Sequence, residues 1–312
     1  MNRSILILFI AFSSGCLPYE ADLAATIRAA TGLPPSPEPT LLLTAAPSPT
    51  KQPAPATITP AVTENSSPIA AAPSATELAC RQEPGRVDRH TLPSGLAPNP
   101  WEFRVYTPPC YDQDSQRMYP LLVLIHGSTY NDDQWDRLGA DETADLLIRE
   151  NRLAPFLILM PRDRVWSEPE DDPFDEALVQ EILPWVETSY RAGGRREDRA
   201  IGGLSRGASW AVHIGLSQWQ IFGAIGAHSL PMFIDDPNRI QSWLDDIPVE
   251  SLPRLFLDIG EKDYLLEKAL WFESLLTERN IPHEWYLYPG RHEESYWQSH
   301  LEQYLLWYAA GW

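Results

Sequence analysis

Short apolar runs alternate with longer segments of helical periodicity over the second part of this 312-residue chain. Residues 121–125 (Leu-Leu-Val-Leu-Ile) are apolar without a break, which is typical of a strand that is covered on both faces. Related runs predict further strands at 87–92, 103–107, 156–160, 200–204, 221–227, 255–259 and 285–288. Strands that alternate with helices predict an α/β fold with a mostly parallel central sheet flanked by helices on both faces.

The helical segments are recognised by apolar residues three and four positions apart. One such series is Phe174, Leu178, Ile182 and Trp185, and a second runs over residues 265–276. Pro184 lies inside the first series, and we expect it to kink that helix because proline lacks a backbone N–H.

Residues 1–16 have the pattern of a bacterial export signal. Arg3 precedes a short apolar run, which is too brief to span a bilayer and ends at Cys16. The small residues before Cys16 resemble a lipobox, although Ser13 stands where leucine is commonest. We therefore predict an exported protein that is held on the outer face of the cell membrane by a lipid on Cys16, with an ordinary cleaved signal peptide as the alternative.

Residues 17–79 differ in composition from the rest of the chain. They contain 12 of the 30 prolines and a single aromatic residue, Tyr19. Such a segment cannot bury enough apolar surface to offset its ordering entropy, so we predict a disordered tether. The folded domain is then expected over residues 80–312.

Charge and cysteine content narrow the class of protein. The net charge is −19, which argues against a nucleic-acid partner and against electrostatic attachment to anionic lipid. Besides Cys16, the chain has only Cys80 and Cys110. An exported protein meets an oxidising compartment, so we expect these two to form a disulfide, with two buried thiols as the alternative. The oligomeric state is not predicted by the sequence.

The clearest chemical signal is Gly203-Leu204-Ser205-Arg206-Gly207. This G-x-S-x-G sequence follows a predicted strand and precedes a helical pattern, which is the context of a nucleophile elbow. Such a turn exposes the Ser205 hydroxyl at the carboxyl edge of the sheet. The alternative is a glycine-rich turn that carries a surface serine.

A serine nucleophile needs a base, and the base needs a group that orients it. His292 lies on the loop after the last predicted strand, where such a base is expected. For the acid we favour Asp263, which lies beyond the end of the 255–259 strand, over Glu261 and then Asp258.

Two backbone N–H groups are required to bind the oxyanion of an acyl-transfer intermediate. One is expected from Arg206, directly after the nucleophile. The other is expected from Ser128, which follows His126-Gly127 at the end of a predicted strand. We interpret His126 as a structural hydrogen-bonding residue.

Residues from about 100 to 310 resemble the esterase D–type esterases of the α/β-hydrolase fold, a group that includes feruloyl and acetyl-xylan esterases, enterochelin esterase-like enzymes and mycolyltransferases. The resemblance rests on Val105-Tyr106-Thr107-Pro108-Pro109, Leu124-Ile125-His126-Gly127, the Ser205 motif, Asp263 and His292 in the family order. Ala208 departs from the pattern, where a further glycine is common. The resemblance implies serine carboxylic-ester hydrolysis through an acyl-enzyme, without a metal or organic cofactor.

The expected substrate is a small-molecule or polysaccharide ester. The alternatives are an acyltransferase that acts on a cell-envelope acceptor and an inactive surface binding protein on the same scaffold. Trp135, Trp166 and Trp297 are candidates for an aromatic wall beside the substrate. The acidic residues 168–172 are interpreted as solvated surface or as a barrier to anionic ligands.

Overall fold

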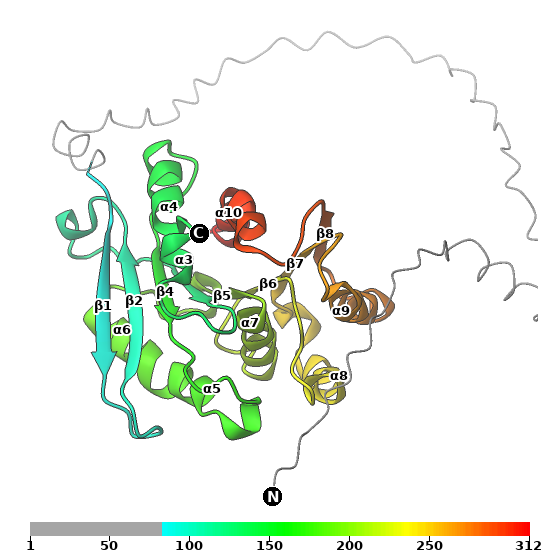
Figure 1. Ribbon diagram of the computed structural model, residues 1–312. Coiled ribbons are helices and arrows are strands. Elements are labelled where there is room, and N and C mark those ends of the chain that lie inside the picture. Colours follow the sequence, from blue (N-terminus) through cyan, green and yellow to red (C-terminus); the bar gives the residue numbers. More distant parts are fainter. Residues whose placement is uncertain (1–82) are drawn as a thin grey trace, which may run out of the picture. The chain divides into compact units, whose positions relative to one another are not determined.

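A computed structural model of the chain describes residues 83–312. Eight strands form one sheet in the order β1-β2-β4-β3-β5-β6-β7-β8 (Figure 1). β1 and β2 pair antiparallel, β2 pairs antiparallel with β4, and the remaining neighbours are parallel. The predicted mostly parallel sheet is thus confirmed, with an antiparallel hairpin added at one edge.

The strands lie close to the predicted apolar runs. Their bounds are β1 Arg86–Leu92, β2 Trp101–Thr107, β3 Leu121–Ile125, β4 Leu157–Pro161, β5 Arg199–Leu204, β6 Ala224–His228, β7 Arg254–Gly260 and β8 Glu284–Tyr288. The expected 221–227 strand begins later than predicted, because Ile221 and Phe222 belong to the turn before β6.

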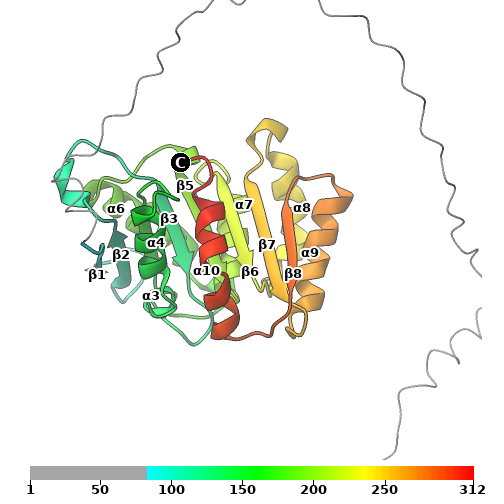
Figure 2. The same ribbon diagram turned by 90° about the horizontal axis from the view of Figure 1, so that it is seen from above.

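The helices cover both faces of the sheet, as Figure 2 shows. One face is covered by α3 Gln134–Arg137, α4 Ala140–Arg149 and α10 Glu294–Tyr308. The other is covered by α5 Phe174–Ala177, α6 Leu183–Ser189, α7 Arg206–Ser217, α8 Asp236–Asp246 and α9 Leu266–Glu278. Within the described residues, no helix is long and apolar enough to cross a membrane.

The central strands contribute to both layers because successive side chains point to opposite faces. In β3, Leu122 and Leu124 pack under α4 and α10, whereas Leu121, Val123 and Ile125 pack under the α5–α9 layer. This double burial explains why the run at 121–125 is apolar without alternation.

The helix that contains Pro184 is irregular just before the proline. A π-helical turn at Leu178–Ile182 joins α5 to α6, and Pro184 lies in the first turn of α6. The Leu183 N–H still donates to the Leu178 carbonyl, so the hydrogen-bond pattern changes next to Pro184, which has no N–H to donate.

Candidate functional site

Ser205 lies on a sharp turn between β5 and α7. Its backbone has φ 52° and ψ −125°, a conformation that is uncommon for a residue with a side chain. The Ser205 N–H donates to the carbonyl of His228 at 2.8 Å, which fastens the turn to β6. The hydroxyl is therefore held at the carboxyl edge of the sheet, at the N-terminus of a 12-residue helix.

The two glycines of the motif are required by close backbone contacts. A Cβ at Gly207 would lie 2.1 Å from the carbonyl oxygen of Ile125, and one at Gly203 would lie 2.3 Å from the backbone of Gly207. No side chain fits at either position, so the G-x-S-x-G spacing follows from how tightly β5, the turn and α7 pack against β3.

The structure brings Ser205, His292 and Asp263 into one hydrogen-bonded chain. His292 Nε2 lies 2.9 Å from the Ser205 hydroxyl oxygen, and His292 Nδ1 lies 2.9 Å from Asp263 Oδ2. A carboxylate only accepts hydrogen bonds, so the imidazole proton lies on Nδ1. Nε2 is then left as the acceptor that faces the serine hydroxyl.

Asp263 is buried just beyond β7. Burial alone would raise the pKa of its carboxyl group, but hydrogen bonds from His292 and from the backbone N–H of Leu265 outweigh it and hold the pKa below the ordinary value. The group is thus ionised at neutral pH, as required to stabilise a protonated histidine.

Two aromatic rings enclose the imidazole of His292. Its ring centre lies 4.7 Å from that of Tyr264 and 5.0 Å from that of Trp297, which meets it edge-on. Trp297 is buried, and its indole N–H donates to the Ser229 hydroxyl at 3.2 Å. Tyr264 is 76% exposed and forms the open side of the site.

The expected aromatic wall is therefore only partly correct. Trp135 is buried in the core, where its indole N–H donates to the carbonyl of Ile125, and Trp297 packs behind His292. Of the three tryptophans, Trp166 alone is substantially exposed. Tyr264, which the sequence pattern did not single out, lies beside His292 instead.

The other two candidate acids have different surroundings. Glu261 is exposed on the loop after β7. Asp258 is fully buried within β7, where it binds His228 Nδ1 at 2.6 Å and accepts hydrogen bonds from the hydroxyls of Tyr296 and Tyr304. His228, the last residue of β6, is part of this polar network and has no exposed surface.

The loop after β3 carries the predicted second oxyanion donor. Ser128 is exposed there, while the N–H of the preceding Gly127 is already bound by Gln134 Oε1 at 2.8 Å. His126 has the structural role expected of it. Its Nε2 accepts the Asp163 N–H at 3.0 Å, so Nδ1 carries the proton donated to the Gly127 carbonyl, and burial lowers the pKa of the ring.

The acidic loop after β4 is not simply solvated surface. Asp172 is buried, and both it and Asp163 contact the guanidinium of Arg206. The sequence pattern indicated a role only for the backbone of Arg206 and gave no prediction of this side-chain cluster. The available signal was the position of Arg206 between Ser205 and Gly207 in a motif expected to be buried. A buried arginine needs carboxylate partners nearby.

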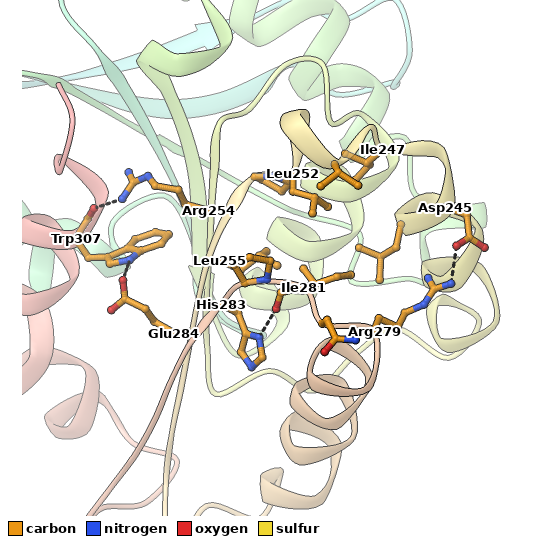
Figure 3. A pocket seen from close by; sticks show the side chains of 15 residues that line it. Asp245, Ile247, Leu252, Arg254, Leu255, Arg279, Ile281, His283, Glu284 and Trp307 are labelled. Carbon is orange, nitrogen blue, oxygen red and sulfur yellow. Dashed lines mark hydrogen bonds and ion pairs between the residues drawn. The ribbon is translucent and has the colours of Figure 1, made fainter. Parts of the chain in front are cut away.

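A separate pocket of about 760 Å³ lies at the amino ends of β7 and β8, away from the strand ends that carry the candidate site (Figure 3). Its lining includes Arg254 and Glu284, the first residues of β7 and β8, whereas Asp263 and His292 follow the ends of those strands. Several polar groups drawn there are paired: Arg254 with the Trp307 carbonyl, Glu284 with the Trp307 indole, and Arg279 with Asp245.

Two predictions lie outside the described residues: the lipid site at Cys16 and, because Cys80 is not described, the disulfide with Cys110. The same holds for the signal and tether segments. Within residues 83–312, no group of three or more His, Cys, Asp or Glu side chains is placed to hold a metal ion.

The sheet order, the elbow and the Ser205–His292–Asp263 chain define an α/β-hydrolase. The chain belongs to the family described as "Putative esterase", whose model matches residues 96–308. The expected resemblance to esterases is thereby confirmed.

Individual relatives are more distant. The chain is 27% identical over 156 residues to an endo-1,4-beta-xylanase/feruloyl esterase of Xylanibacter ruminicola, covering 44% of this chain and 21% of that protein. It is 25% identical over 236 residues to an esterase of Mycobacterium tuberculosis, covering 57% of this chain and 49% of that protein. The chain thus spans half or less of the length of these curated relatives.

Solved structures share the fold. A ferulic acid esterase superposes with a TM-score of 0.65 at 24% identity, covering 73% of this chain and 98% of that one. A fluorophosphonate-binding serine hydrolase of Staphylococcus aureus superposes with a TM-score of 0.63 at 18% identity, covering 73% and 99%.

Proposed function

We propose that this protein is a serine carboxylic-ester hydrolase that acts outside the cytoplasm through an acyl-enzyme on Ser205. The observation that carries the proposal is the hydrogen-bonded chain from the Ser205 hydroxyl through both ring nitrogens of His292 to Asp263, with 2.9 Å at each link. Family membership supports ester hydrolysis as the reaction.

In the first half of the reaction, His292 Nε2 takes the proton of the Ser205 hydroxyl while its oxygen attacks the ester carbonyl carbon. Asp263 holds the ring and stabilises the imidazolium that forms. The oxyanion is bound by the backbone N–H groups of Arg206 and Ser128, and the N-terminus of α7 adds the favourable end of its dipole.

His292 then gives its proton to the leaving alcohol oxygen, and the carbon–oxygen bond of the ester breaks to leave the acyl group on Ser205. In the second half, water repeats the sequence in the role of the alcohol. His292 removes its proton, the carbon–Ser205 bond breaks, and the acid is released.

The relatives' own descriptions support one substrate class as the first to test. Several similar proteins are described as feruloyl or ferulic acid esterases. An ester of an aromatic acid on a polysaccharide is therefore the first natural substrate to test, alongside acetylated polysaccharide.

The direct test uses the full chain, with hydrolysis of p-nitrophenyl acetate and butyrate and labelling by a fluorophosphonate probe as readouts. We expect the wild type to turn over both esters and to be labelled, and Ser205→Ala to do neither. Wild-type protein that is folded yet inert in both assays would rule the proposal out.

The proposed location rests on Cys16 and the apolar run before it. A bacterial host grown with labelled fatty acid should incorporate the label into the full chain, and Cys16→Ala should abolish it. Unlabelled wild-type protein would exclude the lipid anchor without affecting the esterase assignment.

A further inference from the structure

The side chain of Arg206, the residue after Ser205, is buried and makes its hydrogen bonds to a single loop. Its Nε donates to Asp163 Oδ2 at 2.6 Å, its Nη2 lies 3.3 Å from Asp172 Oδ2, and Nη2 also donates to the Ser167 carbonyl. All three partners belong to loop 162–173, which follows β4. One side chain therefore ties this loop to the turn that carries Ser205.

The same guanidinium also contacts loop 229–235, which follows β6. Its central carbon lies 5.0 Å from the ring centre of Phe233, within the range of a cation–π contact. The next residue, Ile234, donates its N–H to Glu168 Oε2 at 2.8 Å. The two loops are thus joined to each other and to Arg206.

A buried cluster of one arginine and two carboxyl groups is costly to form. The side chains of Asp163 and Asp172 have no exposed surface, and that of Arg206 is 10% exposed. Burial, and next the neighbouring Asp163, raise the pKa of Asp172 to about 7. Apolar residues often replace such clusters without loss of stability, so the cluster calls for an explanation other than stability.

The two loops present apolar side chains to solvent. Val165 and Trp166 are each 48% exposed, and Ile234 is 75% exposed; we call these three residues the rim. Asp163 Oδ1 accepts the N–H groups of Val165 and Trp166 at 3.2 and 3.3 Å. Trp166 has φ 56°, an unfavourable conformation for a bulky residue, which the surrounding bonds must maintain.

The strand order indicates which part of an ester Val165 and Trp166 face; Ile234, the third rim residue, follows β6 on the other side of β5. His292 follows β8, while loop 162–173 follows β4, on the other side of β5 in the sheet. The leaving alcohol must lie beside His292, because His292 gives it a proton. The acyl group then points away from His292, toward loop 162–173.

We propose that Arg206, through Asp163, Asp172 and Ser167, is a positioning residue that fixes the rim as a binding surface for apolar acyl groups. The proposal rests on Ser205 being the nucleophile of an esterase. It adds a function for the Arg206 side chain that is separate from the backbone N–H expected to bind the oxyanion.

The test measures kcat and KM of the full chain for p-nitrophenyl acetate and p-nitrophenyl hexanoate, which share a leaving group and differ in acyl length. We expect Arg206→Met and Trp166→Ala each to lower kcat/KM for hexanoate roughly tenfold, mainly through KM, with much less effect on acetate. The double variant should lose no more than either single one, because both remove the same contact. Arg239→Met is the matched control, since it breaks an exposed ion pair with Glu170 on the same loop and should change neither ester.

Equal losses for both esters in Arg206→Met, or losses that multiply in the double variant, would overturn the proposal. Should Arg206→Met fail to fold, Arg206→Lys keeps the charge without the two-pronged geometry. It should speed amide hydrogen exchange in residues 162–173 and 229–235, and unchanged exchange there would refute the anchoring. A wild type that hydrolyses neither ester would instead refute the esterase function, so the two failures are distinguishable.

Discussion

Asp258 and Asp263 flank the carboxyl end of β7, yet each binds a different histidine. Asp258 binds His228 at 2.6 Å inside the core, whereas Asp263 binds His292 at 2.9 Å beside Ser205. The strand ends between them, and this change from strand to loop decides which carboxylate can orient the proposed base.

These two surroundings predict different consequences of the same substitution. Asp263→Asn should lower kcat by roughly 10³–10⁴-fold with little loss of stability, because an amide no longer fixes the tautomer of His292. Asp258→Asn should instead lower the free energy of unfolding by about 1–3 kcal/mol, because it leaves buried partners unsatisfied. Ester turnover and urea denaturation of the two variants and of Glu261→Gln, the exposed control, separate the roles. A larger kcat loss in Asp258→Asn would contradict the assignment.

The Ser205 turn should tolerate no side chain at Gly207. Gly207→Ala would place a Cβ 2.1 Å from the Ile125 carbonyl oxygen, so we expect it to lower the free energy of unfolding by about 1–3 kcal/mol or more. Gly194→Ala is the matched control, because Gly194 is exposed and its added Cβ would meet nothing closer than 3.8 Å. Equal denaturation midpoints for the two variants would show that the turn can accommodate a Cβ at Gly207.

The pKa of Asp172 makes stability depend on pH. The folded state keeps the Asp172 proton up to about pH 7, whereas the unfolded chain releases it near 3.8, so the folded state binds more protons between these values. The free energy of unfolding should therefore fall as the pH rises from about 4 to above 7. Asp172 faces Asp163 and Arg206, and Asp172→Asn removes its part of this dependence.

Urea denaturation of the wild type and Asp172→Asn at pH 5 and pH 8 measures the effect. The variant should gain stability relative to the wild type at pH 8, by an amount on the order of 1 kcal/mol. A difference between the two proteins that is the same at both pH values would show that Asp172 titrates normally.

The predicted bridge between Cys80 and Cys110 would close a loop at the start of the folded domain. Chain-entropy arguments give about 4 kcal/mol for a loop of this length. Reducing agent should therefore lower the melting temperature, and Cys110→Ser should remove that sensitivity. Full alkylation of both residues in denatured, unreduced protein would exclude the bridge.

Much of this architecture was predictable because strong local signals agreed with one another. The apolar run of β3 is typical of a strand covered on both faces. The glycines around Ser205 lie where an added Cβ would clash with neighbouring backbone. His292 was identified by its place after the last strand. The preference for Asp263 over Asp258 depended on where β7 ends, and the structure places Asp263 beside His292 and Asp258 beside His228.

The parts that were missed depend on contacts between distant segments. Arg206 finds its carboxylates in loop 162–173, and nothing in the local sequence distinguishes those residues from solvated surface. Tyr264 follows Asp263 in a loop of no regular pattern, so its position beside His292 was not foreseen. Trp135 and Trp297 lie near the motifs in sequence, but the backbone turns their side chains into the core.

The hydroxyl of Tyr308, on α10, occupies the space above Gly202 in β5, where an added Cβ would lie 1.7 Å away. It also lies 2.9 Å from His228 Nε2, under the strand whose carbonyl fastens Ser205. During ribosomal synthesis, the segment that ends at Ser205 emerges well before the helix that packs beneath it. The elbow can reach its final packing only after Tyr308 has been synthesised. A nascent or C-terminally truncated chain should therefore carry the Ser205 motif without the Tyr308 side chain that packs against β5.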